Sequence, residues 1–264
     1  MIKPSEVFIL VFARDKKGTK EKINELIKLG YPFLIICGEN INSPYCAYRI
    51  NRGKYDAINY GSKFLTKDTK IICLNDVDTK IYYFNKALKK ICEKNIVLLF
   101  SKVVLNDGPQ VVFYNILDKI RRKLLIASSG ELMLIRRDVF KKILPIPPCK
   151  TEDNYISLKT LELGYKTIFF EDCWIRTKRT QTLEEEEFYK KRTVTGIYQA
   201  LSFTKGGPLI RIFYLLLPFI SPLLLLYGRK GVSWMKGIIY GFTNFLSGDR
   251  EGQFEAIQNI NSRL

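Results

Sequence analysis

Two acidic residues, Asp76 and Asp78, closely follow an apolar segment, Lys70–Leu74, whose composition is typical of a buried strand. In an extended chain, side chains two residues apart project from the same face. Adjacent carboxylates repel each other, and a hard divalent cation that also binds substrate phosphates would relieve this repulsion. The pair therefore predicts a Mg²⁺ or Mn²⁺ site, and a solvated turn is the alternative interpretation.

A second acidic pair, Glu152 and Asp153, follows Thr151 at the start of a predicted helix. Capping alone would explain this pair, because threonine is a common N-cap and carboxylates are favourable in the first helical turn. The functional interpretation is that one of the two carboxylates faces the active site as a general base.

A lysine preceded by glycine, Gly53-Lys54, opens another predicted helix. Glycine lets the backbone approach a ligand closely, and a lysine at a loop-to-helix junction is well placed to meet a phosphate. A plain turn before a helix is the alternative for this motif taken alone.

The elements that must position these residues alternate between strand and helix. Buried strands are predicted at Val7–Ala13, Phe33–Cys37, Tyr45–Ile50, Lys70–Leu74 and Asn95–Phe100. Helices are predicted between them at Lys20–Leu29, Lys54–Leu65 and Ile81–Cys92. This order predicts an α/β fold, a mainly parallel sheet with helices on both faces, in which ligands bind beyond the carboxyl ends of the strands.

The next hundred residues show a mixed pattern. Helices are predicted at Phe113–Leu125, Thr151–Leu163 and Glu184–Leu201, and strands at Leu132–Ile135 and Thr167–Phe170. The length of 264 residues suits one large domain with a small appendage.

Composition narrows the chemistry further. Lysine and arginine number 43 against 26 aspartate and glutamate, and the net charge of +17 favours an anionic partner, with a solvated lysine-rich surface as the alternative. The absence of histidine excludes Ser-His-Asp and Cys-His nucleophile systems and histidine metal sites. The six cysteines contain no C-x-x-C pair, which argues against zinc and fits a reduced cytosolic setting.

A sharp change in composition follows Gly206-Gly207-Pro208. Two nearly continuous apolar stretches, Leu209–Tyr227 and Val232–Leu246, are surrounded by basic residues, as expected beside anionic lipid headgroups. Pro218 and Pro222 favour an interfacial or kinked arrangement over a straight span. We expect a catalytic domain at 1–204 and a membrane-associated helical tail at 205–264, located at the cytoplasmic face of the cell membrane. A buried helical hairpin is the alternative.

Taken in order, these motifs resemble the inverting family 2 glycosyltransferases, in the branch of cellulose, chitin and hyaluronan synthases. The matching segments are Gly53-Lys54 with Ala57-Ile58-Asn59, Asp76 with Asp78, Gly130 to Arg136-Arg137, Thr151-Glu152-Asp153, Gly164-Tyr165-Lys166 and Lys191-Arg192-Thr193. Thr193 stands where that family's last motif has tryptophan, which favours a non-processive variant.

The resemblance implies a nucleotide-diphospho-sugar transferase fold and a role for each matching residue. Asp78 would hold Mg²⁺ or Mn²⁺ with Asp76, and Lys54 and Arg192 would contact the donor diphosphate. Glu39 is the nearest candidate for the acid that contacts the donor base. Asp153 would be the general base and Glu152 would position it or the acceptor, while the stretch from Gly130 to Arg136 would line the acceptor side.

The implied partners are a nucleotide-diphosphate sugar, a lipid-linked or glycan acceptor and an anionic membrane surface. Three alternatives stay open at this point. A basic nucleic-acid-binding protein would explain the charge, although no helix-turn-helix, zinc or RNA-recognition signature is present and no nucleic acid is expected. A nucleotidylyltransferase would need a glycine-rich loop after the first strand, where only Gly18 occurs. A catalytically silent transferase-like scaffold is the third.

Overall fold

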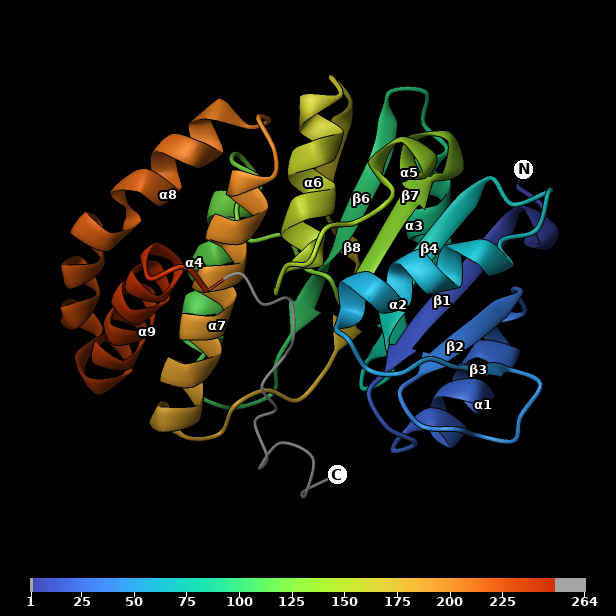
Figure 1. Ribbon diagram of the computed structural model, residues 1–264, viewed down its shortest axis with the longest axis horizontal. Helices are drawn as coiled ribbons and strands as arrows, with labels where there is room; N and C mark the ends of the chain where they lie inside the picture. Colours follow the sequence, from blue (N-terminus) through green and yellow to red (C-terminus); the bar gives the residue numbers. More distant parts are fainter. Residues whose placement is uncertain (1, 250–264) are drawn as a thin grey trace.

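The computed structural model describes residues 2–249. Eight strands within this part of the chain form one sheet in the order β3-β2-β1-β4-β7-β6-β8-β5 (Figure 1). They are β1 Val7–Ala13, β2 Phe33–Cys37, β3 Cys46–Tyr48, β4 Ile71–Asp76, β5 Lys80–Tyr82, β6 Ile96–Val104, β7 Leu132–Arg136 and β8 Lys166–Arg176.

The sheet is parallel on one side and mixed on the other. Strands β3, β2, β1 and β4 run parallel, as do β6 and β8, whereas β7 lies antiparallel between β4 and β6. In this register Leu132 at the start of β7 is opposite Asn75 near the end of β4. The loops that leave β4 and lead into β7 therefore meet at one edge, which is where ligands bind in α/β sheets.

Helices cover both faces of the sheet, as predicted. Strand β1 is buried on both sides: Phe8 and Leu10 belong to one apolar layer, and Ile9 and Val11 to the other. The first layer includes α2 Lys54–Gly61, α5 Arg137–Ile143, α6 Glu152–Glu162 and α7 Leu183–Ser202. The second includes α1 Thr19–Leu29 and α3 Phe84–Ile91. Helix α4, Val111–Arg121, lies behind α7 in the view of Figure 1.

The predicted helix Ile81–Cys92 is wrong in its first turn. Residues Lys80–Tyr82 form the edge strand β5, and the helix begins only at Phe84. Tyr83 between them adopts a left-handed backbone with φ 58°, and Tyr82 stacks on Trp174 of β8 at 4.0 Å between ring centroids. Pairing with β8 overrides the helical pattern because packing against a neighbouring strand decides strand formation.

Three helical segments follow α7: α8 Pro208–Ile220, the 3₁₀ segment η3 Ser221–Tyr227, and α9 Gly228–Leu246. Helix α9 packs closely on α7 (Figure 1). A Cβ on Gly237 would lie 2.6 Å from Cβ of Lys190, and one on Gly241 would lie 2.7 Å from Cβ of Val194. Only glycine permits this approach, because any larger residue would separate the two helices.

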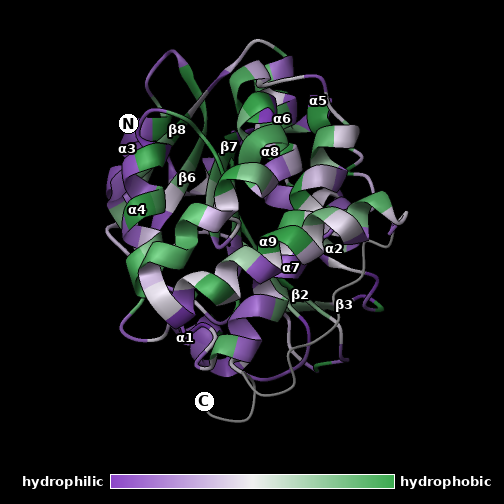
Figure 2. Cartoon of the chain, turned by 90° about the vertical axis from the view of Figure 1, so that its left-hand side faces the viewer, coloured by the Kyte–Doolittle hydropathy of each residue, from purple (hydrophilic) through white to green (hydrophobic). Residues whose placement is uncertain are grey.

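Helix α8 and η3 are packed far less. Among their side chains Ile210 and Tyr214 are buried, whereas Phe219 is 75% and Leu226 86% exposed. Figure 2 turns this end of the molecule toward the viewer and shows hydrophobic residues along α8. Within residues 2–249, one helical stretch, Pro208–Leu246, is long and apolar enough to cross a membrane, and 17% of its most apolar window is buried.

The predicted boundary at residue 204 stays a prediction. Helix α9 lies on the tail side of this boundary and α7 on the other side, yet the Thr195 hydroxyl donates a hydrogen bond to the Gly241 carbonyl (3.1 Å). Residues 250–264 of the predicted tail lie outside the described residues.

Candidate active site

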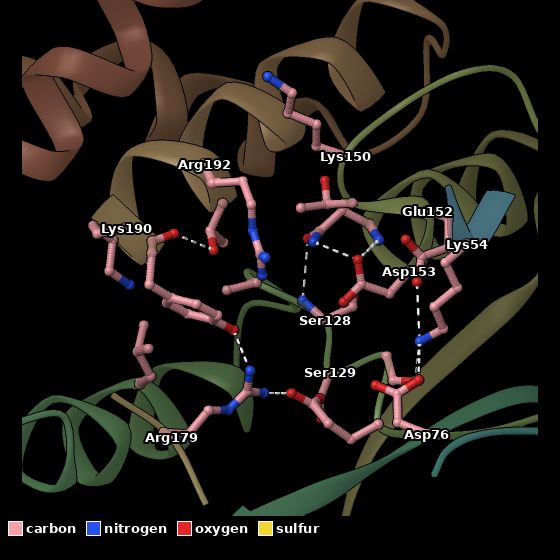
Figure 3. Close-up of a pocket in the computed structure, with 18 of the residues that line it drawn as sticks. Lys54, Asp76, Ser128, Ser129, Lys150, Glu152, Asp153, Arg179, Lys190 and Arg192 are labelled. Carbon is pink, nitrogen blue, oxygen red and sulfur yellow. Dashed lines mark hydrogen bonds and ion pairs between the residues drawn. The ribbon is translucent and has the colours of Figure 1, made fainter. Parts of the chain in front are cut away.

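A pocket opens at the sheet edge where β4 ends, β7 begins and α6 begins (Figure 3). It is lined on one side by Lys54, Asp76, Glu152 and Asp153, which we call the acidic wall. Arg179, Lys190 and Arg192, which we call the basic wall, line the other side. The floor is the segment 127–131, which leads into β7.

The Lys54 ammonium joins the segments of the acidic wall. Its Nζ lies 2.7 Å from Asp76 Oδ1 and 3.1 Å from Glu152 Oε1, and it donates a hydrogen bond to the Gly130 carbonyl at 2.9 Å. Burial alone would lower the pKa of Lys54, but the two carboxylates raise it well above its usual range. The Lys54 ammonium therefore links the first turn of α2 to the first turn of α6, to the end of β4 and to the floor of the pocket.

Asp153 is the member of the acidic wall that faces the basic wall in Figure 3. Its Oδ1 accepts hydrogen bonds from the backbone N–H of Asn154 (2.8 Å) and from Asn154 Nδ2 (3.1 Å). The Asn154 side-chain oxygen in turn accepts from the backbone N–H of Ser128 in the floor (3.1 Å). A Cβ on Gly130 would lie 2.9 Å from Cβ of Asp153, so glycine leaves the space that this carboxylate occupies. These contacts fix the Asp153 side chain in one orientation.

Burial, and then the neighbouring carboxylate of Glu152, raise the pKa of Asp153 to about 7. Lys54 opposes this shift. A carboxyl group with a pKa near neutrality is suited to general-base catalysis, because it is both ionised and basic at the working pH. Thr151 makes no side-chain capping hydrogen bond, so capping by this threonine does not explain the acidic pair at the start of α6.

The basic wall comes from helix α7 and from the loop that precedes it. Arg179 Nη1 donates to the Tyr189 hydroxyl at 2.6 Å, and its other terminal nitrogen pairs with Glu131 of the floor. Arg192 lies over the Tyr189 ring, 5.0 Å from the centroid. Lys190 lies over the ring of Trp234 on α9, with Nζ 3.4 Å from the centroid.

The structure brings most of the predicted site residues together. Lys54, Asp76, Glu152, Asp153 and Arg192 all line this pocket. The two remaining candidates, Asp78 and Glu39, are not among its lining residues.

Asp78 is exposed in the turn after β4, where the negative charge of Asp76 and the positive charge of Arg179 both act on it. Glu39 is also exposed, and its Oε2 accepts a hydrogen bond from the backbone N–H of Lys16 (3.2 Å).

One expectation about the floor is wrong in part. Gly130 lines the pocket, but Arg136 and Arg137 do not, because β7 runs antiparallel to β4 and carries the chain away from the site. Arg136 instead donates to the Ile91 carbonyl (3.2 Å) and Arg137 to the Thr69 carbonyl (3.1 Å).

The residues present fit a divalent cation of the kind predicted. No cluster of three or more histidine, cysteine, aspartate or glutamate side chains with metal-binding geometry occurs within residues 2–249. Asp76 and Asp78 supply two carboxylates, and Mg²⁺ or Mn²⁺ commonly binds through one or two carboxylates together with substrate phosphates and water. Asp76 already attracts the cationic group of Lys54, which shows that a positive charge is stable at this point.

Sequence reasoning missed Arg179, Glu131 and Lys190. Arg179 and Glu131 lie 48 positions apart and pair only because the chain folds back across the pocket. Lys190 directly precedes the motif Lys191-Arg192-Thr193 and belongs to the same run of basic residues. The sequence therefore indicated that this part of the predicted helix is basic. Which of its side chains face the pocket depends on how α7 packs against α9.

No protein-family model and no curated protein matches the sequence. Solved structures do match the fold. The mannosyltransferase PcManGT from Pyrobaculum calidifontis, in complex with GDP-Man and Mn²⁺, is 15% identical with a TM-score of 0.68, over 91% of this chain and 87% of that one. GalNAc-T7 with UDP, GalNAc and Mn²⁺ is 11% identical with a TM-score of 0.54, over 92% of this chain and 56% of that one.

At these identities the likeness concerns the fold. The chain has the fold of nucleotide-sugar glycosyltransferases. A fold does not by itself establish an activity, so the function has to be argued from the pocket.

Proposed function

We propose that this protein is a glycosyltransferase that moves a sugar from a nucleotide-diphosphate sugar to an acceptor hydroxyl, with inversion and with a divalent metal. The observation that carries the proposal is the convergence of Lys54, Asp76, Glu152 and Asp153 on one pocket at the carboxyl end of β4. The fold supports it, because it is similar to that of a mannosyltransferase solved with GDP-Man and Mn²⁺ and to that of GalNAc-T7 solved with UDP, GalNAc and Mn²⁺.

In this mechanism Asp153 accepts the proton of the acceptor hydroxyl while the oxygen attacks the anomeric carbon of the donor. The new carbon–oxygen bond forms on one face as the bond to the diphosphate breaks on the other, so the configuration inverts. The electron pair of the broken bond leaves with the nucleoside diphosphate. The pKa of about 7 lets the Asp153 carboxylate take the proton near neutral pH.

The positive groups of the pocket act on the leaving diphosphate. Asp76 and Asp78 would hold Mg²⁺ or Mn²⁺, which when bound neutralises the charge that develops on the phosphate oxygens. Lys54 and Arg192 add positive charge there, where electrostatic stabilisation contributes most. Glu152 holds Lys54 and thereby keeps the α6 terminus against the acidic wall. Glu39 stays our candidate for the donor base, beyond the end of β2.

The order of the sequence motifs supports a place in the inverting family 2 branch, as a non-processive variant. The exposed apolar face of α8 and η3 supports attachment to a membrane, with the basic residues around it against anionic headgroups, and we propose the cytoplasmic face of the cell membrane. A lipid-linked acceptor fits this position, and a soluble glycan is the other acceptor class.

A panel of nucleotide sugars assayed with Mn²⁺ tests the reaction, with Asp76→Asn and Asp153→Asn as site variants. Asp172→Asn is the control, because Asp172 is exposed on β8 and does not line the pocket. We expect transfer or donor hydrolysis in the wild type and the control and its loss in both site variants. Turnover that persists in both site variants would contradict the proposed mechanism.

Sedimentation with anionic vesicles tests the membrane position. Phe219→Asp on α8 should weaken binding, whereas Ile27→Asp, at an apolar side chain that is 52% exposed on α1, should not. Equal binding of both variants and the wild type would contradict the proposed docking face.

A further inference from the structure

Lys190 is a buried cation that has no hydrogen-bonding partner in the described part of the chain. Its residue is 9% exposed, and its ammonium lies 3.4 Å from the centroid of the Trp234 ring. Within residues 2–249 this ammonium makes no hydrogen bond and no ion pair, although it lines the pocket. A cation–π contact replaces only part of the hydration that a buried ammonium loses. The Lys190 ammonium therefore keeps N–H groups with which it can bind an anion that enters the pocket.

No acidic side chain within residues 2–249 forms an ion pair with Lys190. Glu186, one turn earlier on α7, is the negative charge that opposes the lowering of the Lys190 pKa, but its carboxylate accepts a hydrogen bond from the Thr180 hydroxyl (2.5 Å) and not from Lys190. The neighbouring cations have acids of their own: Arg121 pairs with Asp118 at 3.1 Å.

Arg179, the other cation whose charge acts on Lys190, also has an acidic partner, Glu131. Burial lowers the pKa of Lys190 to about 8, and the positive charges of Arg121 and Arg179 contribute in the same direction. Among residues 2–249, Arg121 and Arg179 therefore have acidic partners, whereas Lys190 has none. A bound anion would stabilise Lys190 more than either of these arginines.

The position of Lys190 indicates which substrate would bring the anion. In Figure 3 Lys190 lies across the pocket from Lys54 and Asp76, and Asp153 lies between the two sides. The proposed function places the donor diphosphate and the metal beside Asp76. The base must contact the acceptor hydroxyl, so the acceptor approaches Asp153 from the side of the basic wall.

We propose that Lys190 binds a phosphate group carried by the acceptor, a site that deepens the proposed function and rests on it. Phosphate suits this position because the Lys190 ammonium offers three N–H donors to the oxygens of one group. The same chemistry is found in soluble phosphate esters and in phosphorylated lipid headgroups. The exposed apolar face of α8 makes a lipid source compatible with the fold.

Calorimetric titration of the full-length protein with glycerol 3-phosphate tests the site directly. We expect Lys190→Met to weaken binding about tenfold, the loss of one charge-assisted contact of about 1.4 kcal/mol, and Lys190→Arg to retain most of it. Lys63→Met is the matched control, because Lys63 is exposed just after α2, does not line the pocket and should change affinity less than twofold. Thermal unfolding of each variant verifies that the fold is kept.

A second arm separates the two sources of phosphate. Phosphatidic acid in phosphatidylcholine vesicles is compared with glycerol 3-phosphate for wild type, Lys190→Met and Lys63→Met. A loss specific to Lys190→Met in vesicles assigns a lipid phosphate, and a loss with the soluble ester assigns a soluble one. Equal affinity of wild type and Lys190→Met for both probes would overturn the proposal.

The outcome is distinguishable from failure of the proposed function. If the wild type neither binds nor hydrolyses any nucleotide sugar, the glycosyltransferase mechanism fails, whatever the phosphate titration gives. If nucleotide sugars turn over but Lys190→Met binds phosphate like the wild type, the acceptor phosphate site alone is wrong.

Discussion

The two walls of the pocket carry opposite charge and are built in different ways. In the acidic wall the carboxylates of Asp76 and Glu152 are neutralised by Lys54, which sits between them. In the basic wall Arg179 has an acid partner, but Lys190 rests on an aromatic ring. The acidic wall is therefore stable without ligand, whereas the basic wall gains most when an anion binds.

The difference also concerns what holds each wall in place. The acidic wall is built on the ends of β4 and the starts of α2 and α6, which the sheet fixes. In the basic wall Lys190 and Arg192 belong to α7, whose position depends on close contact with Gly237 and Gly241 of α9. We infer that the acidic wall determines the chemistry and that the basic wall determines which acceptor is used. The following predictions test this division, from the largest expected effect to the smallest.

Replacing the base at the centre of the pocket should separate activity from stability. Asp153→Asn should reduce the turnover number about 10²- to 10⁴-fold, the usual contribution of a general base. The same variant should raise the free energy of unfolding at pH 8 by about 1 to 4 kcal/mol, because the raised pKa of Asp153 shows that its charge is unfavourable in the fold. Steady-state kinetics and urea unfolding measure the two effects.

Asp68→Asn, at an exposed aspartate outside the pocket, is the control and should change neither quantity. An Asp153→Asn protein that is both active and no more stable than wild type would contradict the assignment.

Removal of the central cation should damage the acidic wall more than any change in the basic wall. Lys54→Met leaves Asp76 and Glu152 without a counter-charge, and breaking a buried ion pair on one side costs about 3–5 kcal/mol. Urea unfolding at pH 7 should show this loss, whereas Lys63→Met, at an exposed lysine, should show none. A Lys54→Met protein as stable as the control would show that the wall is not held by this charge.

The pH dependence of turnover should follow Asp153. Since its pKa is about 7 and the base must be ionised, turnover should rise about tenfold between pH 6 and pH 8. Stability should change in the opposite direction: the folded protein holds this proton more tightly than the unfolded chain, so its contribution is full below about pH 4 and is lost as the pH rises through about 7. Turnover that is flat across this range would indicate a different base.

The smallest effect is expected where the tail touches the pocket floor. The backbone N–H of Ala127, a residue with φ 46°, donates a hydrogen bond to the Tyr214 hydroxyl of α8 at 3.1 Å. Tyr214→Phe leaves this N–H without its acceptor, which should cost about 1–3 kcal/mol of stability and lower turnover a few-fold. Tyr240→Phe, on the exposed side of α9, is the control. An unchanged melting temperature in Tyr214→Phe would show that α8 does not support the floor.

The sequence allowed the sheet and the acidic wall to be predicted because both depend on local patterns. The apolar run Val7–Ala13 forms β1 as predicted, and the acidic motifs lie at the ends of elements that meet at one sheet edge. The antiparallel insertion of β7 was not predictable from its five residues, because nothing in Leu132–Arg136 specifies which neighbours it pairs with.

Most of the basic wall was not predictable for a related reason. Arg179 reaches the pocket by contacts with Tyr189 and Glu131, and Lys190 by the packing of α9 through Trp234. These contacts join distant parts of the chain and leave no regular spacing in the sequence. Arg192 was found only because it belongs to a motif that resembles a known family.

The most direct test of the account is a crystal structure of the full chain with Mn²⁺ and a nucleotide-diphosphate sugar, with the metal located by its anomalous scattering. We predict one manganese ion bound to Asp76 or Asp78 and to the diphosphate, with the anomeric carbon of the sugar facing Asp153. A metal and donor bound away from the acidic wall, or an anomeric carbon facing away from Asp153, would contradict the account.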